Sequence, residues 1–301
     1  MASEQAAAVV KMLKERPVAP AGATIEDMRK GLDAGFGAGT LAADIRCEKV
    51  DVDGVPAEWV SAGNSSASRA VLYLHGGGYV LGSIQSHREL CSHVARAAAA
   101  RVLLIDYRLG PENPFPAAVE DGVKAYRWLL KQVPASSIAI AGDSAGGGLT
   151  AATLISLRDQ GVELPAAGVM LSPWTDLAAT GESMKSRATL DPMVSADAVG
   201  PMAAAYLGGA DAKNPLASPL YAELRGLPPL LIQVGTSETL FDDATRFDAR
   251  ARTAGVDVTF EAWNEMVHVF QAFAAMLPEG QEAVDHLGAF IQSRTRELAR
   301  A

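Results

Sequence analysis

The chain has 301 residues, of which 49% are hydrophobic, and its formal net charge is −9 with a pI of about 5.1. This acidic balance disfavours nucleic acid and acidic membranes as partners, because either would require a basic surface. No uncharged stretch reaches the roughly 20 apolar residues of a membrane span, and the first 20 residues do not resemble a signal peptide, so we expect no stable membrane insertion and a cytoplasmic location.

Two helices are predicted within residues 2–36, because apolar residues recur there at helical spacing in two groups. Pro17, Pro20 and Gly22 separate the groups and are expected to break the helix between them.

From residue 47 onward, the patterns of strands and helices alternate. Residues 47–52 and 58–61 flank Asp53-Gly54, a pair typical of a hairpin turn. Further apolar strands are predicted at 71–74, 102–105, 138–141, 167–171, 230–234 and 258–260, with helices at 84–99, 116–133, after 144, at 242–254 and at 281–298. Apolar strands separated by helices are typical of a mostly parallel sheet covered on both faces. We therefore expect an α/β fold, with the hairpin at one edge of the sheet.

Residues 178–217 interrupt this alternation, because they lack a strand pattern and only residues 198–206 have helical spacing. We predict that this stretch and residues 1–40 form a helical cap over a core of residues 41–177 and 218–301. A long crossover connection is the alternative interpretation.

The two cysteines, Cys47 and Cys91, lie far apart and form neither a CxxC pair nor a metal-ligand spacing. A disulfide framework is therefore not expected, and we expect both residues to be free, buried thiols.

The most informative segment is G-x-S-x-G at residues 142–146, between a predicted strand and a predicted helix. A serine on such a turn is lifted out of the sheet, and glycines flank it because side chains would collide with the turn. Ser144 is therefore a candidate nucleophile, and a glycine-rich turn with an incidental serine is the alternative. A serine nucleophile also needs a base, an acid that orients the base, and amide donors for an oxyanion.

The amide donors are sought in the sequence HGGG at residues 75–78, directly after a predicted strand. Consecutive glycines allow backbone N–H groups to face a substrate oxygen, and this pattern is typical of esterase and lipase oxyanion loops. A phosphate-binding loop is the rival interpretation, but no Gly-Lys-Ser/Thr or GxGxxG follows. Ala145, the residue after Ser144, is expected to donate a further amide.

Five histidines compete for the role of base. His75 belongs to the glycine loop, whereas His87 and His93 lie on the next predicted helix, where surface or packing roles are expected. The chain order of such triads is serine, acid, histidine, which leaves His268 and His286. Because His286 lies within a predicted helix and is expected to be exposed, His268 is the predicted base.

The acid is expected just after a strand and between the other two residues. Glu238, Asp242 and Asp243 all follow the strand at 230–234. Asp242 and Asp243 lie in the first turn of the next predicted helix, where acidic residues favour the helix dipole. Glu238 comes first, in the loop at the carboxyl end of the strand, and is therefore the predicted acid.

Together these pieces resemble the bacterial hormone-sensitive-lipase-like (family IV) esterases of the α/β-hydrolase fold. The resemblance runs from about residue 71 to the C-terminus and is carried by HGGG, by residues 106–118, by GDSAGG at 142–147 and by Ser172-Pro173-Trp174. It implies a nucleophile at Ser144, a base at His268, oxyanion amides at Gly76, Gly77 and Ala145, and a cap built partly from the N-terminal segment.

The chain departs from the family pattern at a few positions. The family usually has Asp followed by Pro-Leu where this chain has Glu238-Thr239-Leu240. Glutamate can orient a histidine equally well, but it is one methylene longer, so we expect its loop to lie slightly further back. Tyr79, often tryptophan in the family, and Val269, often glycine, are candidate substrate-binding residues.

The sequence thus predicts a carboxylic-ester hydrolase with a Ser-His-Glu triad, acting on small-molecule esters with short acyl chains. No metal or organic cofactor is implied, and a homodimer is a candidate assembly. A small-molecule receptor on the same fold, similar to the gibberellin receptors that lack a working triad, is the alternative, and the presence of His268 favours the enzyme. Amide or lactone hydrolysis would use the same residues.

Overall fold

The structure is a computed structural model, and it describes residues 2–15 and 22–296. Its strands are β1 (Arg46–Val52), β2 (Val55–Ser61), β3 (Ser66–Leu74), β4 (Ala100–Ile105), β5 (Ile138–Asp143), β6 (Ala167–Leu171), β7 (Leu230–Gly235) and β8 (Val258–Trp263). Its α-helices are α1 (Glu4–Glu15), α2 (Ile25–Phe36), α3 (Ile84–Ala98), α4 (Ala117–Leu130), α5 (Ala145–Asp159), α6 (Ser183–Ser186), α7 (Ala196–Leu207), α8 (Phe241–Thr253) and α9 (Pro278–Arg294). Short 3-10 turns are η1 (Ala135–Ser137), η2 (Pro219–Tyr221) and η3 (Phe270–Phe273).

The strands form one eight-stranded sheet in the order β1-β2-β4-β3-β5-β6-β7-β8. β1 pairs antiparallel with β2, and β2 pairs antiparallel with β4, whereas all pairs from β4 to β8 are parallel. The predicted parallel sheet with an antiparallel hairpin at its edge is therefore confirmed. Because the carboxyl ends of β3, β5, β6 and β7 lie at one edge of the sheet, the loops that follow these strands are brought together.

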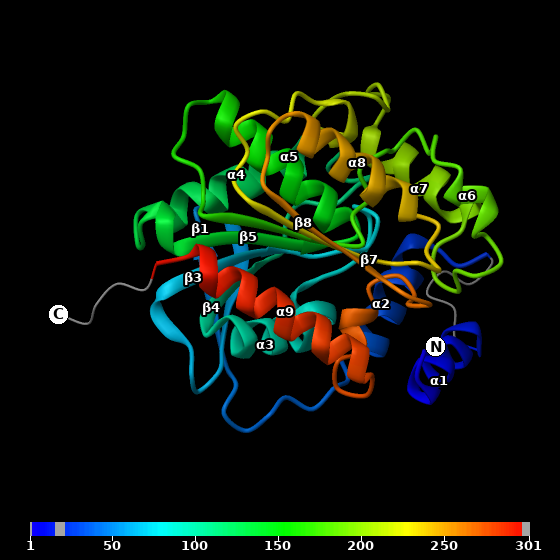
Figure 1. The fold of residues 1–301 in the computed structure, drawn as a ribbon, viewed down its shortest axis with the longest axis horizontal. Helices are drawn as coiled ribbons and strands as arrows, with labels where there is room; N and C mark the ends of the chain where they lie inside the picture. The colour runs from blue at the N-terminus through cyan, green and yellow to red at the C-terminus, as the bar shows by residue number, and fades with distance from the viewer. Residues whose placement is uncertain (1, 16–21, 297–301) are drawn as a thin grey trace.

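Helices cover both faces of the sheet, as expected for apolar parallel strands. α3 and α9 lie on one face, and α4, α5 and α8 lie on the other (Figure 1). In β5, Ile138 and Ile140 belong to the core on the α4–α5 side, whereas Ala139 and Ala141 belong to the core on the α3–α9 side. This alternation follows from the two-residue period of a strand.

The N-terminal helices and residues 178–217 lie at the same end of the sheet (Figure 1). α2 begins at a capping box, in which Thr24 and Asp27 each accept a hydrogen bond from the backbone of the other. Residues 178–217 contain no strand, as predicted, and α7 covers the helical stretch predicted at 198–206. The short helix α6 was not predicted. The predicted helix breakers Pro17 and Pro20 lie outside the described residues.

Two details differ from the sequence analysis. Cys91 is buried, but Cys47 is exposed because it lies on the edge strand β1, most of whose residues face solvent. α9 begins at Pro278, earlier than predicted, since proline suits the first turn of a helix; residue 298, its predicted end, lies outside the described residues. Within residues 2–15 and 22–296, no helix is both long and apolar enough to cross a membrane.

Candidate active site

Ser144 lies on the sharp turn between β5 and α5, and its backbone has φ 54° and ψ −120°. This conformation is rare for a residue with a side chain and is typical of a strained functional turn. Gly146 makes the turn possible, because a Cβ there would meet the carbonyl oxygens of Leu74 and His75. The glycine spacing in the sequence therefore reflects close backbone contact.

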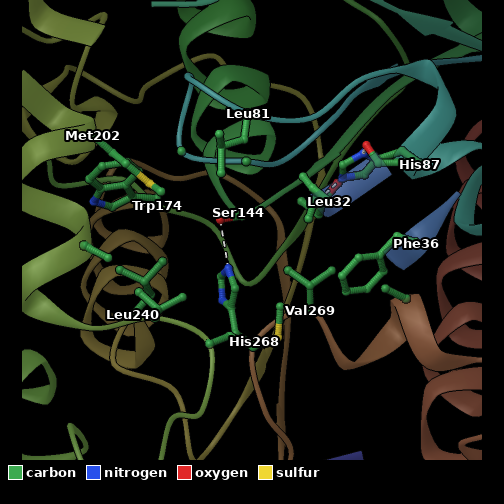
Figure 2. Close-up of a pocket in the computed structure, with 18 of the residues that line it drawn as sticks. Leu32, Phe36, Leu81, His87, Ser144, Trp174, Met202, Leu240, His268 and Val269 are labelled. Atoms are coloured by element: carbon green, nitrogen blue, oxygen red, sulfur yellow. Dashed lines mark hydrogen bonds and ion pairs between the residues drawn. The ribbon is translucent and has the colours of Figure 1, made fainter. Parts of the chain in front are cut away.

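A chain of two hydrogen bonds joins Ser144, His268 and Glu238. The Oγ of Ser144 lies 2.8 Å from Nε2 of His268 (Figure 2). Nδ1 of His268 lies 2.9 Å from Oε2 of Glu238. With the carboxylate accepting at Nδ1, that nitrogen carries the proton and Nε2 is left to accept the serine proton. The structure thus brings together the three residues predicted from the sequence.

Burial and charge act against each other on this chain. Burial lowers the pKa of the His268 imidazole, but the hydrogen bond and the charge of Glu238 outweigh burial and raise the pKa above its ordinary value of 6.5. Burial raises the pKa of the Glu238 carboxyl, and the hydrogen bond from His268 opposes that rise. The imidazole is therefore held as a stronger base than a free histidine.

Ser172 supports both the acid and the base, a role that the sequence analysis missed. Its hydroxyl donates to Oε1 of Glu238 (2.7 Å) and accepts from the backbone N–H of Val269 (3.0 Å), the residue after His268. The N–H of Gly235 donates to the same Oε1 at 2.5 Å. Ser172 directly follows β6, so its position at the end of a neighbouring strand was the available signal.

The glycine loop after β3 requires one correction. The N–H of Gly76 donates to Oδ1 of Asp143 (3.1 Å) and also faces Nε2 of His87 (3.2 Å). Because it is already bonded inside the protein, it is not free for a substrate oxygen. The next two residues, Gly77 and Gly78, line the cavity that contains Ser144.

Three amides remain as donor candidates, those of Gly77, Gly78 and Ala145. Gly77 and Gly78 have φ values of 111° and 61°, which favour glycine. Ala145 is the first residue of α5, where backbone N–H groups lack partners within the helix. Among the described residues, no acceptor is placed to receive any of the three N–H groups.

Asp143 and His87 form a buried polar pair beside the nucleophile. Asp143 accepts a hydrogen bond from the hydroxyl of Tyr73 (2.9 Å), and its Oδ2 lies 3.4 Å from Nε2 of His87. Burial alone would raise the pKa of Asp143, but His87 and Tyr73 lower it below its ordinary value. His87 also lines the cavity. It therefore lies on the face of α3 that is turned toward the site, which the sequence did not indicate.

The cavity around Ser144 has a free volume of about 1020 Å³, its opening to solvent included. Its walls are mainly apolar and come from α2, from residues 178–217 and from the core. In Figure 2, Leu32 and Phe36 of α2 lie on one side of Ser144, and Met202 of α7 lies on the other. The apolar lining residues are Leu32, Phe36, Leu81, Leu90, Trp174, Met193, Val194, Ala198, Val199, Met202, Leu240, Val269 and Ala272.

The two predicted substrate-binding residues differ in their positions. Val269 lines the cavity. Tyr79 does not, because its ring is buried and stacks on Tyr206 with the ring centroids 3.9 Å apart. Tyr79 therefore supports the glycine loop from behind, and we do not propose it as a substrate contact.

Comparison with known proteins shows the family to which the chain belongs. Residues 71–272 match the family model described as the α/β hydrolase fold. The chain is 50% identical to an acetyl-hydrolase of Streptomyces hygroscopicus over 249 residues, which cover 82% of this chain and 83% of that protein. It is 34% identical to an esterase of Acinetobacter venetianus, over 83% of this chain and 82% of that protein. A crystal structure of an esterase from the bacterial hormone-sensitive lipase family matches with a TM-score of 0.95 and 52% identity, over 98% of this chain and 100% of that one.

The chain belongs to the α/β-hydrolase family. Within it, the chain groups with the bacterial hormone-sensitive-lipase-like esterases and is a hydrolase of the carboxylesterase type. The resemblance drawn from the motifs is confirmed.

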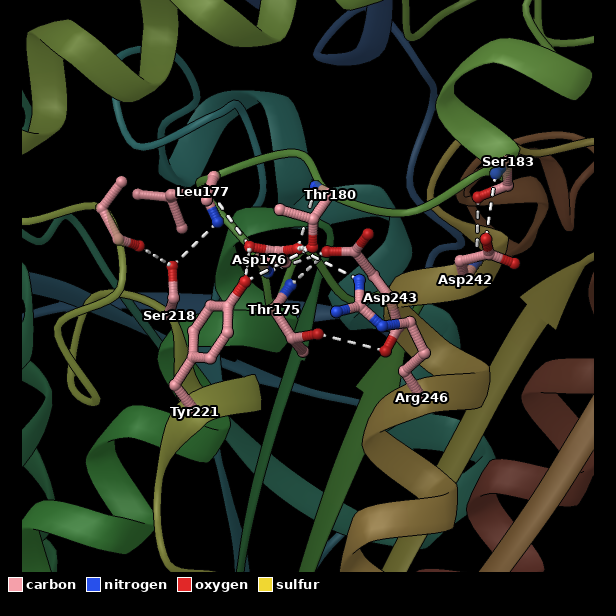
Figure 3. A network of polar contacts seen from close by, with 12 residues as sticks. Thr175, Asp176, Leu177, Thr180, Ser183, Ser218, Tyr221, Asp242, Asp243 and Arg246 are labelled. Atoms are coloured by element: carbon pink, nitrogen blue, oxygen red, sulfur yellow. Dashed lines mark hydrogen bonds and ion pairs between the residues drawn. The ribbon is translucent and has the colours of Figure 1, made fainter.

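In this hydrolase, the two other candidates for the acid, Asp242 and Asp243, lie in the first turn of α8 and make other contacts. Asp242 accepts a hydrogen bond from the N–H of Ser183 (3.0 Å), the first residue of α6. Asp243 is fully buried and accepts from the N–H groups of Thr175 (2.9 Å) and Asp176 (2.8 Å) (Figure 3). The predicted role of both carboxylates, interaction with the helix dipole, is therefore incomplete. Asp242 and Asp243 each also bind a segment that is distant in the sequence.

Asp176 completes this anchor below the loop that follows Trp174. Its carboxylate accepts from Thr180, from the hydroxyl of Tyr221 (3.0 Å) and from Arg246 (3.1 Å) (Figure 3). Burial, and then the nearby charge of Asp176, raise the pKa of Asp243 to about 8. The hydrolase thus fixes the cavity wall at Trp174 with a cluster of hydrogen-bonded polar side chains around Asp176 and Asp243.

Proposed function

We propose that this α/β-hydrolase cleaves short-chain carboxylic esters through an acyl-enzyme formed on Ser144. The observation that carries the proposal is the hydrogen-bonded chain from Ser144 through His268 to Glu238, at the wall of a mainly apolar cavity. A polar nucleophile in an apolar pocket suits an ester of small organic acids, which needs no charged anchor.

The proposed reaction starts when Oγ of Ser144 attacks the ester carbonyl carbon while Nε2 of His268 takes its proton. Negative charge then develops on the carbonyl oxygen, where the amides of Gly77, Gly78 and Ala145 are proposed to donate. The imidazolium gives its proton to the leaving alcohol, which departs and leaves the acyl group bound to Ser144. A water molecule, deprotonated by the same nitrogen, then attacks the acyl carbon, and Ser144 leaves with the proton.

Glu238 is proposed to orient His268 throughout these steps. Its carboxylate holds the proton on Nδ1 of His268 and stabilises the imidazolium that forms in each step. The longer side chain reaches the imidazole from a loop that is also tied to Ser172.

The short acyl preference is supported by the relatives. One, at 50% identity, and another from Mycobacterium tuberculosis, at 33% identity, are named acetyl-hydrolases. The apolar side chains of α2 and of residues 178–217 close over the nucleophile, so we propose that these segments form the cap that limits chain length. The homodimer and the cytoplasmic location stay predictions.

Ser144→Ala tests the proposal directly. We expect the variant to lose the burst and the turnover of p-nitrophenyl acetate, because no other hydroxyl is hydrogen-bonded to His268 among the described residues. A series of p-nitrophenyl esters from acetate to decanoate measures the acyl preference of the native protein, and we expect kcat/KM to fall with length. Retained turnover in the variant would contradict the mechanism. Tight ligand binding without hydrolysis by the native protein would favour the receptor alternative.

A further inference from the structure

Asp191 lies between α6 and α7, and only 8% of its surface is exposed. Its Oδ1 accepts hydrogen bonds from the backbone N–H groups of Met193 (2.9 Å) and Val194 (3.0 Å). Its Oδ2 accepts from the backbone N–H (2.9 Å) and the hydroxyl (3.2 Å) of Thr239. All four partners are donors, which is the arrangement that an ionised carboxylate requires.

These contacts join two parts of the site that are far apart in the sequence. Thr239 directly follows Glu238, the proposed acid. Met193 and Val194 line the cavity around the nucleophile. Asp191 therefore connects the wall of the cavity with the loop that carries the acid.

Both backbone polar groups of Thr239, its N–H and its carbonyl, are hydrogen-bonded to side chains from residues 178–217. Asp191 receives its N–H, and the hydroxyl of Ser183 donates to its carbonyl oxygen at 2.6 Å. The side chain of Thr239 is fully buried. Because a backbone N–H cannot rotate away, its bond to a buried carboxylate restrains the peptide that links it to the acid.

We propose that Asp191 is a positioning residue for the ester hydrolysis, which holds the acid loop (residues 235–240) so that Glu238 meets His268. The inference rests on the function proposed above. Small displacements of a catalytic group from its productive position cost a large part of the rate, so the loss of this restraint should lower kcat.

The charge of Asp191 provides a second, independent readout. The charged groups that act on His268 are Glu238, Asp191 and Asp143. Burial lowers the pKa of His268, the hydrogen bond and charge of Glu238 raise it, and the charges of Asp191 and Asp143 raise it further. Because the neutral imidazole is the active form, removal of one of these charges moves the acid limb of kcat/KM to lower pH.

Asp191→Asn is the central test. One carboxylate oxygen becomes an NH₂ group, so two donors face each other at one end of the contact. We expect kcat for p-nitrophenyl acetate to fall about tenfold and the acid limb to move to lower pH. The measurement is the pH profile of kcat and kcat/KM from about pH 5 to 9, with active sites counted from the burst.

Asp197→Asn is the matched control. Asp197 lies in the first turn of α7, in the same segment, but its side chain is exposed. The substitution removes the same charge without a buried contact, and we expect kcat and the pH profile to stay as in the native protein.

Asp191→Asn with native kcat and an unmoved acid limb would overturn the inference, as would lower thermal stability with an unchanged profile per active site. Should that variant fail to fold, Thr239→Val decides, because it keeps the backbone N–H bond to Asp191 and loses only the hydroxyl contacts with Asp191 (3.2 Å) and with the carbonyl oxygen of Val194 (3.3 Å). We expect its kcat to fall about threefold with no movement of the acid limb, and a native kcat would overturn the inference. If instead Ser144→Ala kept its turnover, the proposed function itself would be wrong, so the two failures are distinguishable.

Discussion

The nucleophile elbow, which is the turn at residues 142–146, carries Ser144, and the acid loop, residues 235–240, carries Glu238. Both residues belong to one hydrogen-bonded chain, but the two segments are held in different ways. Backbone contacts fix the elbow, where Gly146 packs directly against the carbonyl oxygen of Leu74. Buried side chains fix the acid loop, where Glu238 accepts a hydrogen bond from Ser172. The elbow therefore depends on the absence of side chains. The acid loop shares such a contact at Gly235, where a Cβ would meet the carbonyl oxygen of Met266, but its acid, Glu238, is held by polar side chains from other parts of the sequence.

This difference predicts two kinds of sensitivity. A backbone contact tolerates no added atom, because close-packed interiors leave no space for one, but it does not depend on pH. A buried carboxylate tolerates a substituent of its own shape, but its contribution changes with its protonation state. Substitutions in the elbow should therefore act through volume, and those on the acid side should act through charge.

Gly146→Ala should have the largest effect. The added Cβ would meet the carbonyl oxygens of Leu74 and His75 at the start of α5, and backbone atoms there have no room to move. We expect loss of soluble folded protein, or a free energy of unfolding lowered by about 4 kcal/mol or more with no activity. Chemical denaturation and a p-nitrophenyl acetate assay measure both.

Gly200→Ala is the matched control for that substitution. Gly200 lies in α7 with no atom near its missing Cβ, and alanine is the better helix former, but Pro201 follows and disfavours a helical residue with a Cβ before it. Because these two effects oppose each other, we expect the free energy of unfolding to change by less than about 1 kcal/mol and kcat to stay native. Equal losses in the two variants would show that steric contact at the elbow is not what matters.

Glu238→Gln should have the next largest effect. It hardly changes the side-chain volume and should act on kcat. Glutamine can present its NH₂ to Nδ1 of His268 and favour the wrong tautomer, for which a loss of about 10⁴-fold in kcat is typical of a serine hydrolase. Because the charge of Glu238 raises the pKa of His268, the acid limb of the remaining activity should move to lower pH. The pH profile of kcat/KM measures the shift.

Asp242→Asn, four residues further along the chain in the first turn of α8, is the control. Asp242 contacts Ser183 and not His268, so we expect kcat within about threefold of native, the range of one partly buried hydrogen bond. If Asp242→Asn were the crippling change and Glu238→Gln were mild, the acid would be wrongly assigned.

The comparison also explains how much was predictable from the sequence. The elbow can be recognised from local sequence, because the two glycines that its steric constraint requires lie within five residues around Ser144. The order of strands and the triad order then place His268 and Glu238 at neighbouring strand ends. The sheet, its edge hairpin and the contact among the three residues therefore followed from pattern alone.

The partners that hold these residues were not predictable in the same way. The bond from the N–H of Gly76 to Asp143 and the contact of Asp191 with Thr239 depend on tertiary positions. No spacing in the sequence indicates which helix face turns His87 into the cavity. Long-range side-chain contacts leave no periodic signal, so the supporting residues emerge only from the structure.

Asp243 should have the smallest effect on activity and a distinct effect on stability. The folded protein raises the pKa of its carboxyl from 3.8 to about 8, by burial first and then by the charge of Asp176. Between these values the folded state holds a proton that the unfolded state has released, so the resulting stability is complete below pH 3.8 and is lost as pH rises to about 8.

Asp243→Asn removes this titration but keeps an oxygen that can accept from the N–H groups of Thr175 and Asp176. We expect kcat to change less than about twofold. The midpoint of thermal unfolding of the variant should rise relative to the native protein as pH increases from about 5 to 8. Parallel midpoints across this range would mean that Asp243 does not titrate there. The charge dependence assigned to the acid side would then have to rest on Glu238 and Asp191 alone.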